Sequence, residues 1–351
     1  MKLIRVLALI LAGAASLPAN AAPKVLATTP DWGALTQELG GDKVNVYVAT
    51  TALQDVHRVE AKPSLVARAR SADLVVATGA ELEVGWLPVL IQESGNANIQ
   101  RGARGYFEAA SALRLLEVPS QVDRAMGDIH PYGNPHVQLD PHNIQAVAHA
   151  LTARLSQLDP GQAAYYAARA KDFDARWDAA MKAWEARAAP LKGVQVVIMH
   201  RDQLYLCHWL GLVEVASIEP KPGVPPTAAY LGALVGKLTT TPPKLILLNT
   251  YNDPKAADWL SGRVHVPAVV LPFSVGGSDG AKDLFGLFDD TISKLLAALK
   301  LTTCSSTSAS WCPRWSRASW SPSRTYHSVS RCCRAASCSS TWPSPRSRHW
   351  A

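Results

Sequence analysis

The chain has 351 residues, enough for two domains of ordinary size, and its formal net charge is +7. The excess positive charge lies at the two ends, because residues 22–300 carry 26 basic and 28 acidic side chains. A body with a net charge of about −2 lacks the basic surface that phosphates require, so nucleic acid is not an expected partner. The same body contains one cysteine, Cys207, which excludes an intrachain disulfide within it.

Residues 1–21 have the pattern of a secretory signal peptide. Lys2 and Arg5 precede an apolar stretch that is too short to span a bilayer. The small residues Ala19 and Ala21 form a small-x-small cleavage site. We therefore expect cleavage before Ala22 and export to the periplasm.

The body alternates short apolar runs with segments of helical periodicity, which predicts parallel β-sheets covered by helices. The runs fall into two groups, so we expect two Rossmann-like α/β lobes over residues 22–160 and 190–300. The expected strands are 25–28, 44–48, 74–78, 194–200, 244–248 and 268–271, and expected helices include 63–71, 228–238 and 281–299.

Two helical segments lie between the two groups of strands. The first begins at Asp140-Pro141, where an N-cap acceptor precedes a proline at the first helical position. The second, residues 161–189, places its large side chains at steps of three, four or seven and so has one apolar face. At 1.5 Å per residue this helix is roughly 40 Å long. We expect it to join the lobes rigidly, with a ligand site in the cleft between them.

From about Leu301 the composition changes abruptly. Fifteen of the last 51 residues are Ser and five are Trp, and no periodicity remains. Disordered segments are rarely rich in Trp and Cys, so we interpret residues 301–351 as a frameshifted, disordered tail. Regrouping the codons of residues 335–351 from their third positions, with a consistent choice of synonymous codons, yields GIVFIDLAVAQIAALG, an apolar string typical of a membrane helix.

Three widely spaced histidines stand in sequences suited to presenting a ligand. They are His57, His136 after an Asn-Pro pair, and His200 at the end of an apolar run. Neutral imidazole is the commonest protein ligand for a divalent transition metal. Because small zinc modules take their ligands in close pairs, this spacing favours a binding protein or an enzyme.

Over roughly residues 24–299 the chain resembles the solute-binding receptors of zinc and manganese ABC importers. The matching stretches include VHRVE at 56–60, GAELE at 79–83, GNPHV at 133–137 and IEPKPG at 218–223. The resemblance implies that the metal ligands are His57 and His136 from the first lobe and His200 from the second. Manganese-type members commonly have Glu in the third position, so His200 indicates Zn²⁺ as the bound ion, with Mn²⁺ less favoured.

This family often supplies a fourth, carboxylate ligand after the last strand of the second lobe. Ser274 stands near that place here, and the following glycine-rich loop carries Asp279. We expect Asp279 to be the fourth ligand, with Glu60, His130 or a water molecule as alternatives.

The resemblance also implies a function without catalysis. A monomeric receptor would capture the ion and deliver it to a membrane permease driven by a cytoplasmic ATPase. The string GIVFIDLAVAQIAALG resembles the start of the permease subunit of such importers, which favours transport. One alternative is a three-histidine zinc hydrolase with Glu60 as general base, although the chain has no H-E-x-x-H helix. A metal-buffering chaperone or adhesin on the same fold is the other.

The frame interpretation predicts that the natural coding sequence leaves this reading frame near residue 300. Resequencing the locus should reveal an inserted or deleted base there, with a permease gene downstream. An uninterrupted frame through residue 351 would contradict the interpretation.

Overall fold

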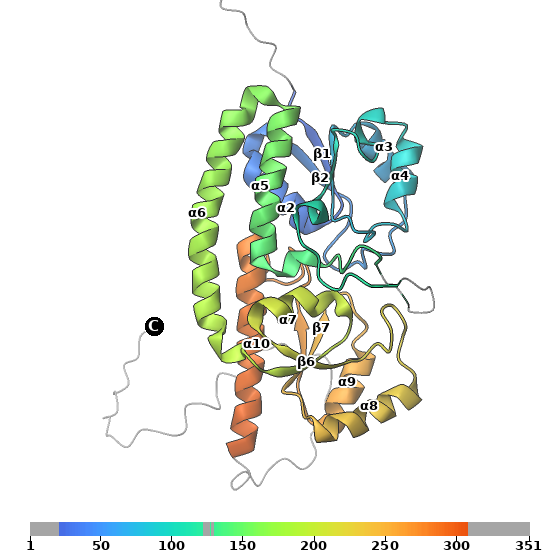
Figure 1. Cartoon of the computed structure of the whole chain (residues 1–351), viewed down its shortest axis with the longest axis vertical. Helices are drawn as coiled ribbons and strands as arrows, with labels where there is room; N and C mark the ends of the chain where they lie inside the picture. The colour runs from blue at the N-terminus through green and yellow to red at the C-terminus, as the bar shows by residue number, and fades with distance from the viewer. Residues whose placement is uncertain (1–20, 122–126, 128–129, 308–351) are drawn as a thin grey trace, which may run out of the picture. The chain divides into compact units, whose positions relative to one another are not determined.

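The computed structural model describes residues 21–121, 127 and 130–307. Two four-stranded parallel β-sheets form its framework (Figure 1). Their strand orders are β2-β1-β3-β4 and β6-β5-β7-β8. The strands are β1 (Lys24–Ala27), β2 (Asn45–Val48), β3 (Leu74–Ala77), β4 (Tyr106–Glu108), β5 (Gln195–Ile198), β6 (Val213–Ser217), β7 (Leu245–Asn249) and β8 (Ala268–Leu271). The expected α/β fold with two lobes and parallel sheets is confirmed.

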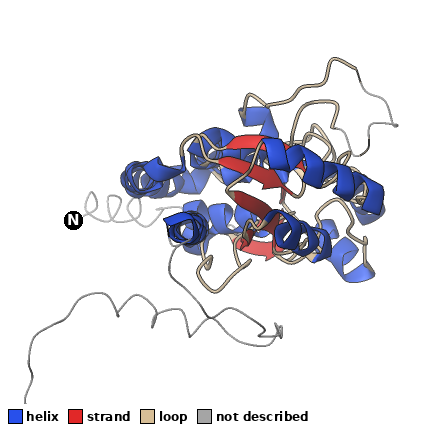
Figure 2. Ribbon diagram, turned by 90° about the horizontal axis from the view of Figure 1, so that it is seen from below, coloured by secondary structure: helices blue, strands red, loops and turns tan. Residues whose placement is uncertain are grey.

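The central strands are recognisable in the sequence because a parallel sheet is covered on both faces. Helices lie on both sides of the strands (Figure 2), and all four residues of β3 and all five of β7 are buried. Such strands read as continuous apolar runs. The sequence did not predict β4 and β6, which are edge strands. β4 has only three residues and β6 has one buried residue in five, so neither forms a continuous apolar run.

The helices also form two groups along the chain, which are separated in the sequence by one long helix. They are α2 (Pro30–Gly40), α3 (Pro63–Arg70), α4 (Leu87–Ser94), α5 (Pro141–Leu158), α6 (Ala163–Ala188), α7 (Leu204–Leu210), α8 (Ala228–Thr240), α9 (Lys255–Val264) and α10 (Leu284–Thr307). We call the part before α6 the N-terminal lobe and the part after it, to residue 305, the C-terminal lobe. The Asp140 carboxylate caps α5 by accepting a hydrogen bond from the His142 amide, 2.9 Å away.

The apolar face of α6 packs against both lobes. The Trp177 indole donates a hydrogen bond of 2.9 Å to the carbonyl of Pro141 at the start of α5. Its ring also lies 4.8 Å, centroid to centroid, from that of Phe285 in α10. Buried side chains of β1, β5, α6 and α10 belong to one continuous hydrophobic cluster. The two sheets therefore share a core along this helix, and their carboxyl ends are held at a fixed separation.

The C-terminal end of the described chain is helical where the sequence analysis expected the disordered tail to begin. α10 continues past Leu301 to Thr307, so the first residues of the proposed tail are helical, and the expected change of reading frame near residue 300 stays a prediction. Extending an existing helix costs little because each added residue also adds a hydrogen bond. Residues 308–351, and all but the last residue of the expected signal peptide, lie outside the described residues. Within the described part of the chain, no helix has the length and apolar character to cross a membrane.

Candidate metal centre

The three predicted histidines meet between the lobes. His57 lies in the loop after β2, His200 follows the carboxyl end of β5, and His136 precedes the short turn that leads into α5. One ring nitrogen from each lies within 4.8 Å of the other two. Loops at the carboxyl ends of parallel strands are the usual place for ligands in α/β folds, and here two such loops from different sheets face each other.

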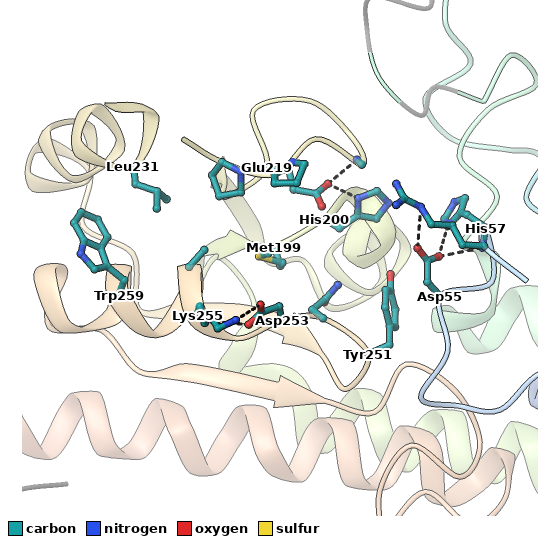
Figure 3. Close-up of a pocket in the computed structure, with 16 residues that line it drawn as sticks. Asp55, His57, Met199, His200, Glu219, Leu231, Tyr251, Asp253, Lys255 and Trp259 are labelled. Atoms are coloured by element: carbon teal, nitrogen blue, oxygen red, sulfur yellow. Dashed lines mark hydrogen bonds and ion pairs between the residues drawn. The ribbon is translucent and has the colours of Figure 1, made fainter. Parts of the chain in front are cut away.

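Carboxylates orient two of the three rings. Asp55 Oδ1 lies 2.8 Å from His57 Nδ1, and Glu219 Oε2 lies 2.6 Å from His200 Nδ1 (Figure 3). Glu219 is itself held by the amide of Gly223, which donates a hydrogen bond of 2.8 Å. A carboxylate on Nδ1 fixes the proton there and leaves the Nε2 lone pair available to a metal ion. The sequence analysis did not assign this orienting role to Glu219.

His136 is the most deeply buried of the three, with 2% of its surface exposed. Neither of its ring nitrogens has a hydrogen-bond partner among the residues that the structure describes. Burial, followed by the nearby charges of His57, His200 and His130, holds the pKa of His136 well below 6.5. The ring is therefore neutral at pH 7. An unpaired polar group in the interior costs about 1–3 kcal/mol, and a bound cation would remove that cost at one of the two nitrogens by accepting its lone pair.

His200 has the opposite electrostatic setting. Burial lowers its pKa, but the hydrogen bond with Glu219 and the negative charges of Asp202 and Glu219 outweigh burial and raise the pKa to about 9. Asp202 is fully buried and accepts hydrogen bonds from Asn249 and Tyr251. At neutral pH the ring of His200 is protonated in the metal-free protein, so a cation that binds there must displace the proton.

Asp279, the expected fourth ligand, does not lie in the cluster. Its side chain is exposed, and among the described residues the group with converging ligand atoms contains only the three histidines. The loop is held in another direction, because the Ser278 hydroxyl donates a hydrogen bond of 2.6 Å to Asp290 in α10. Glu60 is also exposed and outside the group. His130, the remaining side-chain alternative, lies beside His57, with 3.3 Å between their Nε2 atoms.

Ser274, near the place of the family's fourth ligand, makes a contact between the lobes instead. Its hydroxyl donates a hydrogen bond of 2.6 Å to Asp31, and the amide of Val275 donates one of 3.0 Å to the same carboxylate. Asp31 lies in the first turn of α2 and is 1% exposed. Next to Ser274, the ring of Phe273 lies 5.8 Å from that of His136. The Asp31 contact therefore holds an aromatic wall of the histidine cluster in place.

A cavity of about 570 Å³ adjoins the cluster. His57 and Asp55 line it from the N-terminal lobe, and His200, Tyr251 and Trp259 line it from the C-terminal lobe (Figure 3). The cavity gives a hydrated ion a path to the ring nitrogens.

Two α/β lobes around a long shared helix, with a histidine cluster at the facing strand ends, define a solute-binding protein with a site suited to a metal ion. Residues 25–298 match the family described as ZnuA, zinc-uptake complex component A, periplasmic. The chain belongs to this family.

Named relatives agree with this assignment. The high-affinity zinc uptake system protein ZnuA of Paracoccus denitrificans is 26% identical over 321 residues, covering 80% of this chain and 94% of the relative. The protein of the same name from Bacillus subtilis is 24% identical over 269 residues, covering 76% and 82%.

Solved structures share the fold. A crystal structure of ZnuA matches with a TM-score of 0.67 and 21% identity, covering 79% of this chain and 99% of that one. A cadmium-bound periplasmic metal binding protein from Candidatus Liberibacter asiaticus matches with a TM-score of 0.65 and 17% identity, with the same two coverages.

The Asp31 contact leads to a prediction about pH. Burial raises the pKa of Asp31 from 3.8 to about 6, against the opposing effect of its hydrogen bonds with Ser274 and Val275. The resulting stabilisation is fully present below pH 3.8 and is lost as the pH rises through about 6, by about 3 kcal/mol in total. Asp31→Asn, which cannot ionise, should therefore gain stability relative to wild type as the pH rises from 4 to 7.

Urea unfolding of both metal-free proteins across this pH range measures the difference. The control is Asp279→Asn, which removes an exposed carboxylate from the neighbouring loop. A flat difference for Asp31→Asn would show that the Asp31 carboxyl is not buried in solution.

Proposed function

We propose that the chain is an exported receptor that captures one divalent metal ion with His57, His136 and His200 and delivers it to an ABC importer. The observation that carries the proposal is His136, a buried neutral imidazole whose two nitrogens have no hydrogen-bond partner in the described part of the chain, set beside two carboxylate-oriented imidazoles. A buried ring without hydrogen bonds is unfavourable in a protein core, whereas its available lone pair is suited to binding a cation.

Zinc is the proposed ion. Three imidazole nitrogens without a carboxylate in the ligand set suit a borderline cation, whereas Mn²⁺ prefers oxygen ligands. Two relatives, matched over 80% and 76% of this chain, carry zinc in their names. A relative named for manganese, the lipoprotein PsaA of Streptococcus anginosus, is matched over 44% of this chain.

The partners follow from the family. Its members are components of metal ABC transporters, so we infer a membrane permease and a cytoplasmic ATPase as partners and a location outside the cytoplasm. We further propose that the signal peptide is cleaved before Ala22 and that the mature protein is a monomer in the periplasm. The ATPase does the work of transport, and the receptor itself performs no chemical step.

The same geometry offers little to a three-histidine zinc hydrolase. Such an enzyme needs a free base near the metal to activate water. Glu60 is exposed and outside the cluster, while Asp55 and Glu219 are engaged by Nδ1 atoms of the ligands. A buffering chaperone or an adhesin would share the site, and only transport itself separates them from the receptor.

The ligand assignment predicts that His136→Ala loses one equivalent of tightly bound Zn²⁺, with a fall in affinity of about 100-fold or more, since removing partners even one shell further out costs about 10- to 100-fold. Competition with a chromophoric chelator measures both stoichiometry and affinity. His208→Ala is the matched control, because His208 is exposed on α7 and outside the cluster. Equal effects of the two substitutions would contradict the assignment.

The export proposal predicts that the protein recovered from the periplasm of a host cell begins at Ala22. Intact-mass measurement gives the new N-terminus. Ala21→Arg, which places a large charged side chain at the cleavage site, should leave the leader uncleaved. An unprocessed wild-type chain in the cytoplasm would contradict the proposal.

A further inference from the structure

We propose that Asn134 is a positioning residue of the metal centre, whose side-chain amide joins His136 to the loop of His200 across the two lobes. The proposal rests on the metal-receptor function. Asn134 Oδ1 accepts a hydrogen bond of 3.0 Å from the amide of His136. Asn134 Nδ2 donates one of 2.8 Å to the carbonyl of Arg201, the residue after His200. One buried side chain thus holds the backbone beside two ligands.

The partners of these two hydrogen bonds fix the orientation of the amide. A backbone N–H can only donate and a backbone carbonyl can only accept, so Oδ1 and Nδ2 of Asn134 cannot exchange places. A carboxylate at this position would keep the first hydrogen bond, but it would set an acceptor against the carbonyl of Arg201. The position therefore requires an amide for its hydrogen bonding as well as for its size.

His136 depends on its backbone for its position more than the other two ligands do. Carboxylates at Nδ1 orient the rings of His57 and His200, whereas the ring nitrogens of His136 have no hydrogen-bond partner among the described residues. The His136 ring is oriented by packing, including its contact with Phe273, and by the backbone from which it projects. A hydrogen bond that holds this backbone therefore sets the position of the ring.

Other contacts of Asn134 hold its segment against the C-terminal lobe. The hydroxyl of Tyr205 in α7 donates a hydrogen bond of 2.8 Å to the carbonyl of Asn134 and accepts one of 3.0 Å from the amide of Leu116. The amide of Asn134 donates a hydrogen bond of 2.8 Å to the carbonyl of Leu116. The backbone at these two residues is thus tied together and fastened to α7.

An ion pair reinforces the same junction. Nε of Arg201 donates a hydrogen bond of 3.0 Å to Glu117, and a second guanidinium nitrogen contacts the other oxygen of that carboxylate. The third nitrogen donates one of 2.7 Å to Glu214. Glu117 has a φ of 52°, in the left-handed region that residues other than glycine rarely adopt, and such a conformation persists where its surroundings enforce it. We call Asn134, Arg201 and Glu117 the interlobe brace.

The interlobe brace divides the metal centre into two parts. His136 and His200 are joined through it, and their ring centroids lie 5.5 Å apart. His57 lies in a separate loop that is held to the N-terminal lobe, because the Trp86 indole donates a hydrogen bond of 2.8 Å to the carbonyl of Val56. Weakening the brace therefore lets two ligands separate while the third stays in place. This change should speed the loss of a bound ion more than it slows the binding of one.

The test compares Asn134→Asp with Asn96→Asp in the full chain. Asn96 is a matched control, because its Oδ1 accepts a hydrogen bond of 3.0 Å from the amide of Asn98 and its Nδ2 donates one of 2.7 Å to the carbonyl of Ala72. It lies in the N-terminal lobe, outside the histidine cluster. Three quantities are measured: the Zn²⁺ affinity by chelator competition, the rate of Zn²⁺ loss into excess chelator, and the urea midpoint of the metal-free protein.

We expect Asn134→Asp to lower the Zn²⁺ affinity by about 10- to 100-fold, chiefly through faster loss, with a urea midpoint close to that of Asn96→Asp. Glu117→Gln weakens the same brace at an exposed side chain and should change the affinity and the rate in the same direction, by less. Its control is Asp172→Asn, which breaks an exposed ion pair with Arg176 on α6.

Three results would overturn the proposal while leaving the receptor function intact. The first is Zn²⁺ loss from Asn134→Asp at the rate of Asn96→Asp. The second is a fall in affinity that both variants share in proportion to their urea midpoints, because this would show a general effect on folding. If Asn134→Asp does not fold, Glu117→Gln decides, and Zn²⁺ loss at the rate of Asp172→Asn is the third. A wild-type chain with no tight Zn²⁺ site would overturn the receptor function as well.

Discussion

The burial of one face of α6 against both lobes is the constraint on which the metal centre depends. His57 and His200 come from loops at the ends of different sheets, and a metal ion tolerates only small errors in the positions of its ligands. Among the described strands, no hydrogen-bonded pair connects the two sheets. The sheets are connected by side-chain packing instead. Trp177 and Trp184 of α6 contact Phe285 and Phe288 of α10, within the hydrophobic cluster that both lobes share. The separation of the sheets is thus set by the packing of large rigid rings.

The charge of a cation bound by the histidines would be balanced by carboxylates that contact the histidine rings rather than the ion. Asp55 and Glu219 contact Nδ1 of His57 and His200, so negative charge would lie close to a cation bound by the three imidazoles although no carboxylate belongs to the converging group. This arrangement keeps the preference of imidazole for a borderline metal and also offsets the cost of placing a doubly charged ion between two largely apolar lobes. His136, with no carboxylate partner, is kept neutral by burial instead.

The features that were predictable from sequence were local ones. The buried strands β3 and β7 and the helix α6 have periodicities that can be read within a few residues, and the ligand histidines stand in short recognisable motifs. Glu219 is 19 residues from His200, and Asp31 is 243 residues from Ser274. Nothing in the local sequence indicates that either pair meets. Asp279 lies outside the histidine cluster for a related reason, because hydrogen bonds from its loop to Asp31 and Asp290 fix the direction of the loop.

The shared core has a consequence for how an ion leaves. In proteins whose domains have separate cores, a hinge can open the cleft widely at little cost, because few apolar contacts are broken. Here a wide opening would pull Phe273 and α10 away from partners in the same hydrophobic cluster as β1 and α6, and it would expose aromatic surface to water at about 25 cal/mol per Å². Dissociation is therefore cheapest through displacement of the ligand-bearing loops alone. On this basis a transport partner that displaces those loops would release the ion without separating the lobes.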